Sequence, residues 1–361
     1  MSKGRRMQEK PNRRSMETRP KKRKGLKIFG ITVLVLIIIL LAIVGGTYFY
    51  IQDKLNKIQH VDIDVSQLDI SDQVEENLSG YRNIALFGID SRSLDDYGTG
   101  NRSDCIIIAS INEKTKEVKL MSVYRDTYVQ IEGHGLDKIT HAYSYGEAPL
   151  AISTLNTNLD LNIKEFVTVN FDAVAEAINE LGGVTITVDE SELKYINEYV
   201  RGTANNTGLE AHEVTSAGTQ TLDGVQAVAY ARIRYTAGGD YKRAERMRTV
   251  VEAMFNKLKT KSLGEINAFA DSILPKIYTN ITANDILAMV PDLLNYKITD
   301  SIGWPYETKG ITLNRWYGVP VTLESNVTKM HQELFGESDY VPTQTVQDIS
   351  DKIVNKTGYN S

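Results

Sequence analysis

The feature that most constrains this chain is a run of 24 residues without a charged side chain, Ile28–Ile51. A helix rises about 1.5 Å per residue, so this run would reach about 36 Å, enough to cross the hydrocarbon core of a bilayer with some tilt. The run ends in Tyr48, Phe49 and Tyr50, and aromatic residues gather where a spanning helix meets water. The sequence therefore predicts a single N-terminal transmembrane helix.

The charge around this run predicts its orientation. Residues 1–27 hold 12 lysines and arginines but only two acids, a net charge of +10, which leaves −15 for the rest of a chain whose total is −5. Positively charged flanks stay in the cytoplasm, so 1–27 is predicted to be a basic cytoplasmic tail and the body extracytoplasmic. The bilayer is thus an expected partner. A cleaved signal peptide is the alternative, but its apolar core would be shorter.

The composition of the body excludes two further classes. An acidic body lacks the basic face of a nucleic-acid-binding protein, so no nucleic-acid partner is expected. The single cysteine, Cys105, cannot form an intramolecular disulfide, and the outer domain must be stabilised by its core alone. Cys105 lies in an apolar run, which predicts a buried, unreactive thiol.

Beyond the membrane run the pattern is that of a layered α/β domain. A polar stalk is expected over 52–80, a catalytic domain over 81–260, and a C-terminal extension over 261–361 that packs on the domain or continues it. Strands are predicted over 84–89, 105–111, 118–123, 166–169 and 184–188. Helices are predicted over 149–159, 171–181, 222–231, 241–261 and 282–294, and a long surface loop over 201–221. Strands that alternate with helices indicate an α/β fold.

Two aspartates mark the ends of the first two strands. Asp90 follows one apolar run, Asp104 precedes the next, and Arg92 and Arg102 lie beside them. Ligands of open α/β sheets collect at strand ends, and paired carboxylates with nearby arginines suit a divalent cation and an anionic substrate. The alternative is an ordinary polar loop with surface ion pairs.

Arginine is the recurring signal in the rest of the domain. Arg125 follows a predicted strand, and other arginines follow or open predicted helices: Arg232, Arg234, Arg243, Arg246 and Arg248, with Asp240 just before the last three. Cations at a helix N-terminus oppose the helix dipole, so their clustering there favours an anion site. A solvated basic face paired with acids such as Glu245 is the alternative. Arg243 and Arg246, three residues apart, are expected to share a face.

Other chemistries fit poorly. The sequence contains no GxSxG, no HExxH and no Walker motif, and its five histidines have no metal-ligand spacing. His141, in KITHAY, is expected to be a hydrogen-bonded structural residue. Lys138 of the same segment either reaches a phosphate or packs its stem on apolar surface.

Ordered motifs resemble those of the LytR-CpsA-Psr family of membrane-anchored cell-envelope phosphotransferases. The resemblance covers about residues 81–260 and rests on eight blocks in family order: FGIDSR, NRSD, SVYRDTYV, KITHAY, VNFDAV, ELGGVTITV, LDGVQAVAYARIR and GDYKRAERMR. It implies an α/β/α sandwich with a central mixed sheet and an apolar lipid groove. It also implies transfer of an anionic glycopolymer, of teichoic acid or capsule type, with one phosphate from a polyprenyl pyrophosphate to peptidoglycan, using Mg²⁺.

The resemblance also implies residue roles. Asp90 and Asp104 would hold the metal and, with Arg125, act in catalysis, and one of the two aspartates would serve as base. Asp240 would orient the arginines. The substrate-binding candidates are Arg92, Arg125, Lys138, Arg232, Arg234, Arg243 and Arg246.

The chain departs from the family pattern at three places. Tyr124 stands where the family has proline, Met247 where it has glutamine, and Gly146-Glu147 where it often has Gly-Gly. The charged positions are all kept, so activity is expected, while the pocket shape differs. Two other functions remain open at this point: a hydrolase that uses the same site with water as acceptor, and a non-enzymatic envelope sensor or transcriptional attenuator.

Overall fold

The computed structural model describes residues 57–91 and 96–360. The chain divides into two units, 1–51 and 52–361, and the description below concerns the second. The tail and the membrane run predicted for residues 1–51 lie outside the described residues. Within the described residues, no helix combines the length and the apolar character needed to cross a membrane.

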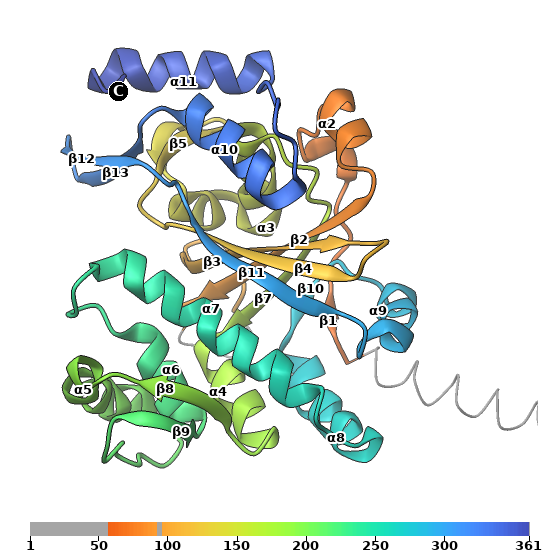
Figure 1. Cartoon of the computed structure of the whole chain (residues 1–361), viewed down its shortest axis with the longest axis vertical. Coiled ribbons are helices and arrows are strands. Elements are labelled where there is room, and N and C mark those ends of the chain that lie inside the picture. Colours follow the sequence, from red (N-terminus) through yellow and green to blue (C-terminus); the bar gives the residue numbers. More distant parts are fainter. Residues whose placement is uncertain (1–56, 92–95, 361) are drawn as a thin grey trace, which may run out of the picture. The chain divides into compact units, whose positions relative to one another are not determined.

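A seven-stranded mixed sheet forms the centre of the unit (Figure 1). Its middle is an antiparallel meander of β2 (Tyr81–Ile89), β3 (Ser103–Asn112) and β4 (Glu117–Val123). Parallel neighbours flank the meander: β7 (Glu165–Asn170) beside β2, and β11 (Lys297–Trp304) beside β4. The short strands β10 (Tyr278–Thr279) and β1 (Gln59–His60) complete the β7 side.

Helices cover both faces of this sheet, so the fold is an α/β/α sandwich (Figure 1). One face carries α2 (Asp72–Asn77), α3 (Thr140–Leu159), α10 (Leu323–Phe335) and α11 (Gln344–Thr357). The other carries α4 (Phe171–Glu180), α6 (Gly224–Arg232) and α7 (Gly239–Leu258), with α5 (Glu190–Thr207) and α8 (Leu263–Ile273) packed outside them. The prediction of an α/β fold with a central mixed sheet is confirmed.

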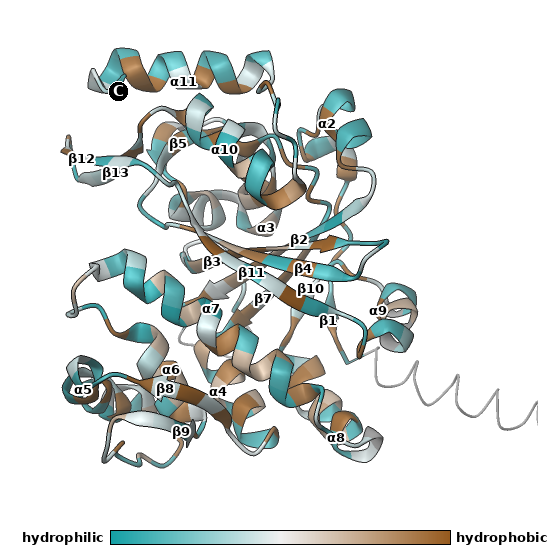
Figure 2. Cartoon of the chain, in the orientation of Figure 1, coloured by the Kyte–Doolittle hydropathy of each residue, from teal (hydrophilic) through white to brown (hydrophobic). Residues whose placement is uncertain are grey.

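Two apolar cores result, one on each face of the sheet. Alternate residues of β2 point to opposite faces, so Phe87 packs in the core with α3 and α10 while Ile84 packs in the core with α6 and α7. Brown residues accordingly line the inner faces of the helices in Figure 2, and teal residues face solvent. Both faces are buried, which explains why β3 reads as an almost continuous apolar run.

Three hairpins and a short helix complete the unit. The hairpins pair β5 (Tyr128–Ile131) with β6 (Gly135–Lys138), β8 (Val184–Val188) with β9 (Gly218–Leu222), and β12 (Thr308–Thr312) with β13 (Trp316–Pro320). The helix is α9 (Ala283–Met289). The β12–β13 hairpin matters below, because it stands beside the N-terminal end of α7.

The expected stalk differs from the structure. Leu68, Val74 and Leu78 are almost completely buried in the core beneath α3, and β1 pairs with β10 of the sheet. The folded unit thus begins well before residue 81. It also extends beyond 260, because β11 is an edge strand of the sheet and α10 and α11 cover one face.

The predicted surface loop over 201–221 is wrong at both ends. The helix α5 continues to Thr207 and ends at Gly208, whose φ of +69° favours glycine, and β9 already begins at Gly218. The helix starts in a capping box between Asp189 and Glu192. Polar composition hid this helix, because only a narrow stripe of it faces the core.

Candidate functional site

Three strand ends bring the predicted catalytic residues to one edge of the sheet. Asp90 follows the end of β2, Asp104 is the second residue of β3, and Arg125 lies just beyond β4. Because β3 runs antiparallel to both neighbours, its start lies beside the ends of β2 and β4. The sheet topology therefore assembles residues that are 35 positions apart in the sequence.

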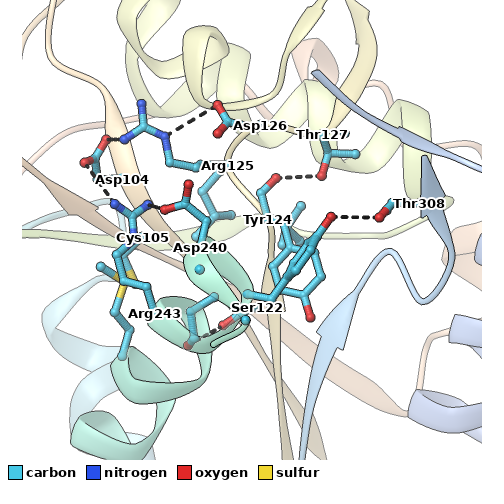
Figure 3. A pocket seen from close by; sticks show the side chains of 18 of the residues that line it. Asp104, Cys105, Ser122, Tyr124, Arg125, Asp126, Thr127, Asp240, Arg243 and Thr308 are labelled. Atoms are coloured by element: carbon cyan, nitrogen blue, oxygen red, sulfur yellow. Dashed lines mark hydrogen bonds and ion pairs between the residues drawn. The ribbon is translucent and has the colours of Figure 1, made fainter. Parts of the chain in front are cut away.

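Asp104 is the acceptor at the centre of an arginine cluster (Figure 3). Arg125 Nη1 donates to Asp104 Oδ1. The other carboxylate oxygen, Oδ2, lies 3.5 Å from Arg234 Nη2 and 3.9 Å from Arg243 Nη1. One carboxylate therefore faces three guanidinium groups.

Asp240 holds two of these arginines from the first turn of α7. Its Oδ1 lies 3.3 Å from Arg243 Nη2 and 3.5 Å from Arg234 Nε, which matches the predicted orienting position. Burial raises the pKa of Asp240, and Asp126 and Asp104 act in the same direction, against Arg234 and Arg125. Arg243 is only 3% exposed, and its Nε has no hydrogen-bond partner within the described residues. A buried guanidinium with an unused donor is costly unless an anion binds there.

These arginines line a cavity of about 490 Å³, here called the arginine cavity. Its walls hold five arginines and two aspartates: Arg102, Arg125, Arg232, Arg234 and Arg243, with Asp90 and Asp104. The remaining walls come from Gly100, Asn101, Phe171, Tyr199 and Met247. The helix α7 contributes Arg243 and Met247 to the same space, and the excess of arginines over aspartates among the lining side chains favours an anion. The chemistry is that of a phosphate or pyrophosphate site.

An apolar cavity of about 240 Å³ adjoins the arginine cavity. It lies between the sheet and the helices α4, α6, α7 and α8, and Phe171 and Met247 line both cavities. Its walls are almost wholly apolar, with Leu86, Ile107 and Met254 among them. An apolar space that opens beside a cluster of arginines suits an amphiphile with a hydrocarbon tail and an anionic head.

Arg246 does not line the arginine cavity, and its predicted role there is corrected. Its side chain is 1% exposed, and Nε lies 2.8 Å from Oε1 of Glu192. The other nitrogens donate to the carbonyl of Ile233 at 3.0 Å and to Thr236 Oγ1 at 2.5 Å. Arg246 therefore fastens α7 to α5 and to the segment after α6, with each of its three nitrogens bonded inside the protein.

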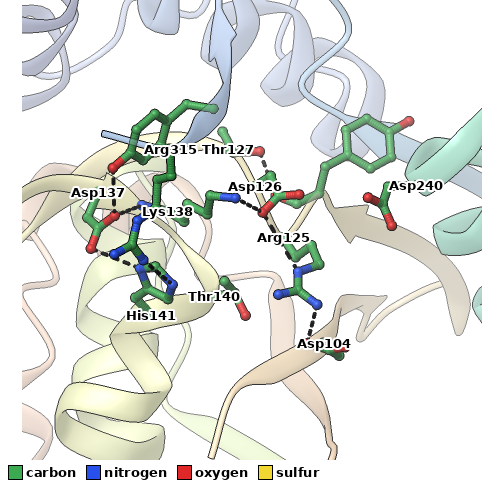
Figure 4. A network of polar contacts seen from close by, with 12 residues as sticks. Asp104, Arg125, Asp126, Thr127, Asp137, Lys138, Thr140, His141, Asp240 and Arg315 are labelled. Carbon is green, nitrogen blue, oxygen red and sulfur yellow. Dashed lines mark hydrogen bonds and ion pairs between the residues drawn. The ribbon is translucent and has the colours of Figure 1, made fainter. Parts of the chain in front are cut away.

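Lys138 also lies outside the arginine cavity and acts through other residues (Figure 4). Its Nζ lies 2.7 Å from Asp126 Oδ1, and the same oxygen lies 3.8 Å from Arg125 Nε. The predicted direct contact between Lys138 and a substrate phosphate is therefore corrected. Lys138 lies behind Arg125, on the far side of Asp126. His141 is buried and bonded, as expected of a structural histidine, with Nδ1 2.9 Å from Asp137 Oδ2.

Of the remaining predicted residues, Arg232 and Arg234 line the arginine cavity, and Arg92 lies outside the described residues. Cys105 is half-buried, and burial together with Asp104 raises its pKa to about 12, so it stays a thiol. Sequence reasoning missed Asp172, at the start of α4. Burial raises its pKa, as does the charge of Asp90, while Arg232 lowers it. Its position two residues after the end of β7, a neighbour of β2, was the available signal.

The residues present fit a magnesium ion. Within the described residues no three His, Cys, Asp or Glu side chains are grouped to hold a metal. Mg²⁺ does not need such a group, since it is commonly bound by one or two carboxylates together with substrate phosphates. Asp90 and Asp104 line the same cavity as the arginines and provide that donor set.

The fold and the site define a class of protein: an α/β/α sandwich that holds an anionic headgroup between arginines beside an apolar cavity. The family model that matches residues 46–333 is that of the LytR_cpsA_psr family, and the chain belongs to this family. The match extends beyond 81–260 at both ends, in agreement with the buried segment before β2 and with β11 in the sheet.

Individual relatives agree. The chain is 32% identical over 308 residues to the polyisoprenyl-teichoic acid–peptidoglycan teichoic acid transferase TagT of Bacillus subtilis, covering 81% of this chain and 91% of TagT. The crystal structure of B. subtilis TagV superposes with a TM-score of 0.56 at 26% identity, covering 73% and 98% of the two chains. A structure of TagT with bound octaprenyl pyrophosphate lipid has the same fold, with a TM-score of 0.50 at 23% identity and coverage of 82% and 94%.

Two of the departures from the family pattern, Met247 and Tyr124, pack in the described part of the structure. Met247 lines both the arginine and the apolar cavity and marks their boundary. The Tyr124 hydroxyl lies against Gly303 of β11, and a Cβ added at Gly303 would come within 2.1 Å of that hydroxyl oxygen. The Tyr124 ring meets the Tyr241 ring edge-on, with the two ring centroids 4.4 Å apart. Tyr124 therefore fits at this position only because residue 303 of the neighbouring strand is glycine.

Proposed function

We propose that this protein transfers an anionic glycopolymer, together with one phosphate, from a polyprenyl pyrophosphate carrier to peptidoglycan. The observation that carries the proposal is the arginine cavity joined to an apolar cavity at Phe171 and Met247. A lipid pyrophosphate needs both environments at once. The name of TagT states the same donor and acceptor classes for a relative that this chain covers over 91% of its length.

In this proposal the two halves of the donor, its prenyl chain and its pyrophosphate, occupy different cavities. The prenyl chain enters the apolar cavity between the sheet and α4, α6 and α7, and the pyrophosphate lies between Arg125, Arg234 and Arg243. These guanidinium groups are held by carboxylates before substrate arrives, so little reorganisation is needed when charge develops on the phosphates. Phosphoryl transfer relies chiefly on such positioning and charge neutralisation.

In the transfer step an acceptor sugar hydroxyl attacks the phosphorus that carries the glycopolymer. A P–O bond forms to the hydroxyl oxygen, and the bond from that phosphorus to the bridging oxygen breaks. Polyprenyl monophosphate leaves with the electron pair. We assign the hydroxyl proton to Asp90, which is exposed in the cavity and makes no ion pair within the described residues. Asp104, in contrast, is already engaged by arginines.

Magnesium belongs to the same proposal. Asp90 and Asp104 would hold it, and when bound it neutralises charge on the pyrophosphate. Asp90 has two carboxylate oxygens, so binding a cation leaves acceptor capacity for the hydroxyl proton. The carboxylates and arginines of this chain supply the rest: they bind the headgroup, orient it, and accept the proton.

The membrane topology is also part of the proposal. The uncharged run 28–51 anchors the chain, the basic tail stays in the cytoplasm, and the domain faces the cell wall. Anchoring keeps the site close to a lipid-linked donor in the same bilayer and raises its effective concentration. An outer location also brings peptidoglycan within reach.

The test compares phosphate-ester products with and without an acceptor. The full chain is incubated with a radiolabelled lipid-linked glycopolymer and Mg²⁺, and release of prenyl monophosphate is followed with and without peptidoglycan. We expect release to be much faster when peptidoglycan is present, because a transferase must keep water from competing. Equal rates with and without peptidoglycan would replace the transferase by a hydrolase that uses the same arginines.

A further inference from the structure

A third cavity, of about 180 Å³, lies against the arginine cavity (Figure 3). The two cavities share a wall made by Asp104, Arg125, Arg243 and Met247. A molecule bound in the third cavity would therefore lie next to the headgroup site. The other walls come from the N-terminal end of α7, from Tyr124 and from the β12–β13 hairpin.

The hairpin presents an indole ring to this cavity. Gly310 and Gly318 face each other across β12 and β13, and the Trp316 ring lies over both. A Cβ added at Gly310 would come within 2.9 Å of Trp316 Nε1, and one at Gly318 within 3.6 Å of Cη2. The paired glycines thus let the ring lie against the backbone. With one face of its ring on the hairpin, Trp316 as a residue remains 45% exposed.

A second aromatic group stands on α7. Tyr241 is 40% exposed, and its hydroxyl lies 2.7 Å from Thr308 Oγ1 on β12. Its ring packs edge-on against Tyr124, which lines the same cavity. These contacts fix the positions of Tyr241 and Trp316. Both residues line the third cavity, which is called the aromatic cavity below. Rigid, partly exposed aromatic rings beside polar groups are typical of sites that bind amphipathic ligands.

Charge separates the aromatic cavity from the arginine cavity. Its walls contain three carboxylates, of Asp104, Asp126 and Asp240, and only two arginines, Arg125 and Arg243, both already paired with those acids. The arginine cavity has five arginines for two aspartates. The lining side chains thus favour an anionic polymer in the arginine cavity over the aromatic cavity. The aromatic cavity suits a neutral ring that has an apolar C–H face and several hydroxyl groups. The hydroxyl groups can donate hydrogen bonds to the carboxylates.

We propose that the aromatic cavity binds a sugar ring of the acceptor glycan, an inference that rests on the proposed transferase function. The ring lies on the indole of Trp316, with Tyr241 beside it. The carboxylates of Asp126 and Asp240 accept hydrogen bonds from its hydroxyl groups. The shared wall then brings the acceptor next to the phosphate that it attacks. Tyr124, where the family has proline, is part of this subsite.

The test is calorimetric binding of a neutral tetrasaccharide of β-1,4-linked N-acetylglucosamine to the full chain in detergent. The Trp316→Ala variant should bind it at least about tenfold more weakly, the scale expected when a stacked aromatic ring is lost. Trp316→Phe should recover most of the affinity. Leu313→Ala, at an exposed residue of the same hairpin that does not line the cavity, should bind as the wild type does.

Two further binding measurements distinguish an acceptor sugar from the anionic donor polymer, and the aromatic cavity from the donor site. An oligomer of glycerol phosphate, which has the chemistry of an anionic donor, should bind equally well to wild type and Trp316→Ala. Prenyl pyrophosphate should also bind both equally, since its cavities do not include Trp316. The proposal is overturned if Trp316→Ala binds the amino-sugar oligomer as tightly as wild type, or if only the anionic oligomer is affected. Either result leaves the donor site, and the proposed function, intact.

Discussion

Glu192 and Arg246 form an ion pair in which both side chains are almost completely buried, with Nε and Oε1 2.8 Å apart. Arg243, less than one turn earlier on α7, is also buried but points to the arginine cavity with an unsatisfied Nε. Two arginines that a spacing of three residues would place together therefore have different tasks. One fastens the helix, and the other faces the ligand.

Removing one partner of the buried pair should destabilise the fold. We expect Glu192→Gln and Arg246→Met each to lower the free energy of unfolding by about 3–5 kcal/mol, because the remaining charge stays buried without its partner. Urea denaturation followed by circular dichroism measures this. The double variant should cost less than the two single changes together. Single-variant losses below about 1 kcal/mol would show that water reaches the pair.

Removing a guanidinium from the arginine cavity should weaken donor binding instead. Arg125→Ala and Arg243→Ala are each expected to weaken binding of a prenyl pyrophosphate by about 1.5–3 kcal/mol, the scale of a hydrogen bond to a charged group. Titration calorimetry gives the dissociation constants. Arg201→Ala serves as the control, because that side chain is 74% exposed and lies outside the cavity. Equal, small effects in all three variants would favour a solvated basic face.

Asp90→Asn tests the proposed metal. The substitution removes one of two carboxylates from the arginine cavity, so Mg²⁺ binding should weaken and turnover should nearly disappear while the circular dichroism spectrum is retained. Calorimetry with Mg²⁺ alone and a transfer assay over a range of Mg²⁺ concentrations provide the two readouts. A variant with an unchanged Mg²⁺ dependence would assign Asp90 a structural role.

Asp172 predicts a pH dependence of stability. Burial and the charge of Asp90 raise its pKa above 3.8, so the folded state holds this proton more tightly than the unfolded state. Its stabilising contribution is thus present below about pH 3.8 and is lost as the pH rises through the folded-state pKa. The melting temperature of the Asp172→Asn variant should not show this loss of stability as the pH rises. The difference from wild type should therefore change over that interval, whereas Asp351→Asn, at an exposed position, should run parallel to wild type. A constant offset between wild type and Asp172→Asn would contradict the shift.

Sequence patterns predicted the elements that carry the site. The apolar runs at 84–89 and 105–111 are β2 and β3, and the acids at their ends meet because antiparallel strands bring a start beside an end. The acidic position at the start of the long helix was also evident, and Asp240 lies in the first turn of α7, 3.3 Å from Arg243. These inferences need only local patterns and the direction of neighbouring strands.

The rest depends on contacts between distant segments. The partner of Arg246 is 54 residues away on α5, a helix that polar composition concealed. Leu68, Val74 and Leu78 lie in the segment that was predicted to be a polar stalk, and their burial follows from their packing beneath α3. The aromatic cavity likewise joins α7 to a hairpin more than 60 residues later. No local pattern contains such pairings.

The measurement that tests the central claim most directly is the identity of the bond formed on peptidoglycan. The full chain is incubated with Mg²⁺, a lipid-linked glycopolymer and peptidoglycan, the product is digested with a muramidase, and the fragments are analysed by mass spectrometry. We predict muramyl fragments that carry the glycopolymer through one phosphodiester, absent when Arg243→Ala replaces wild type. Free glycopolymer ending in a phosphate monoester, with unmodified fragments, would contradict the account.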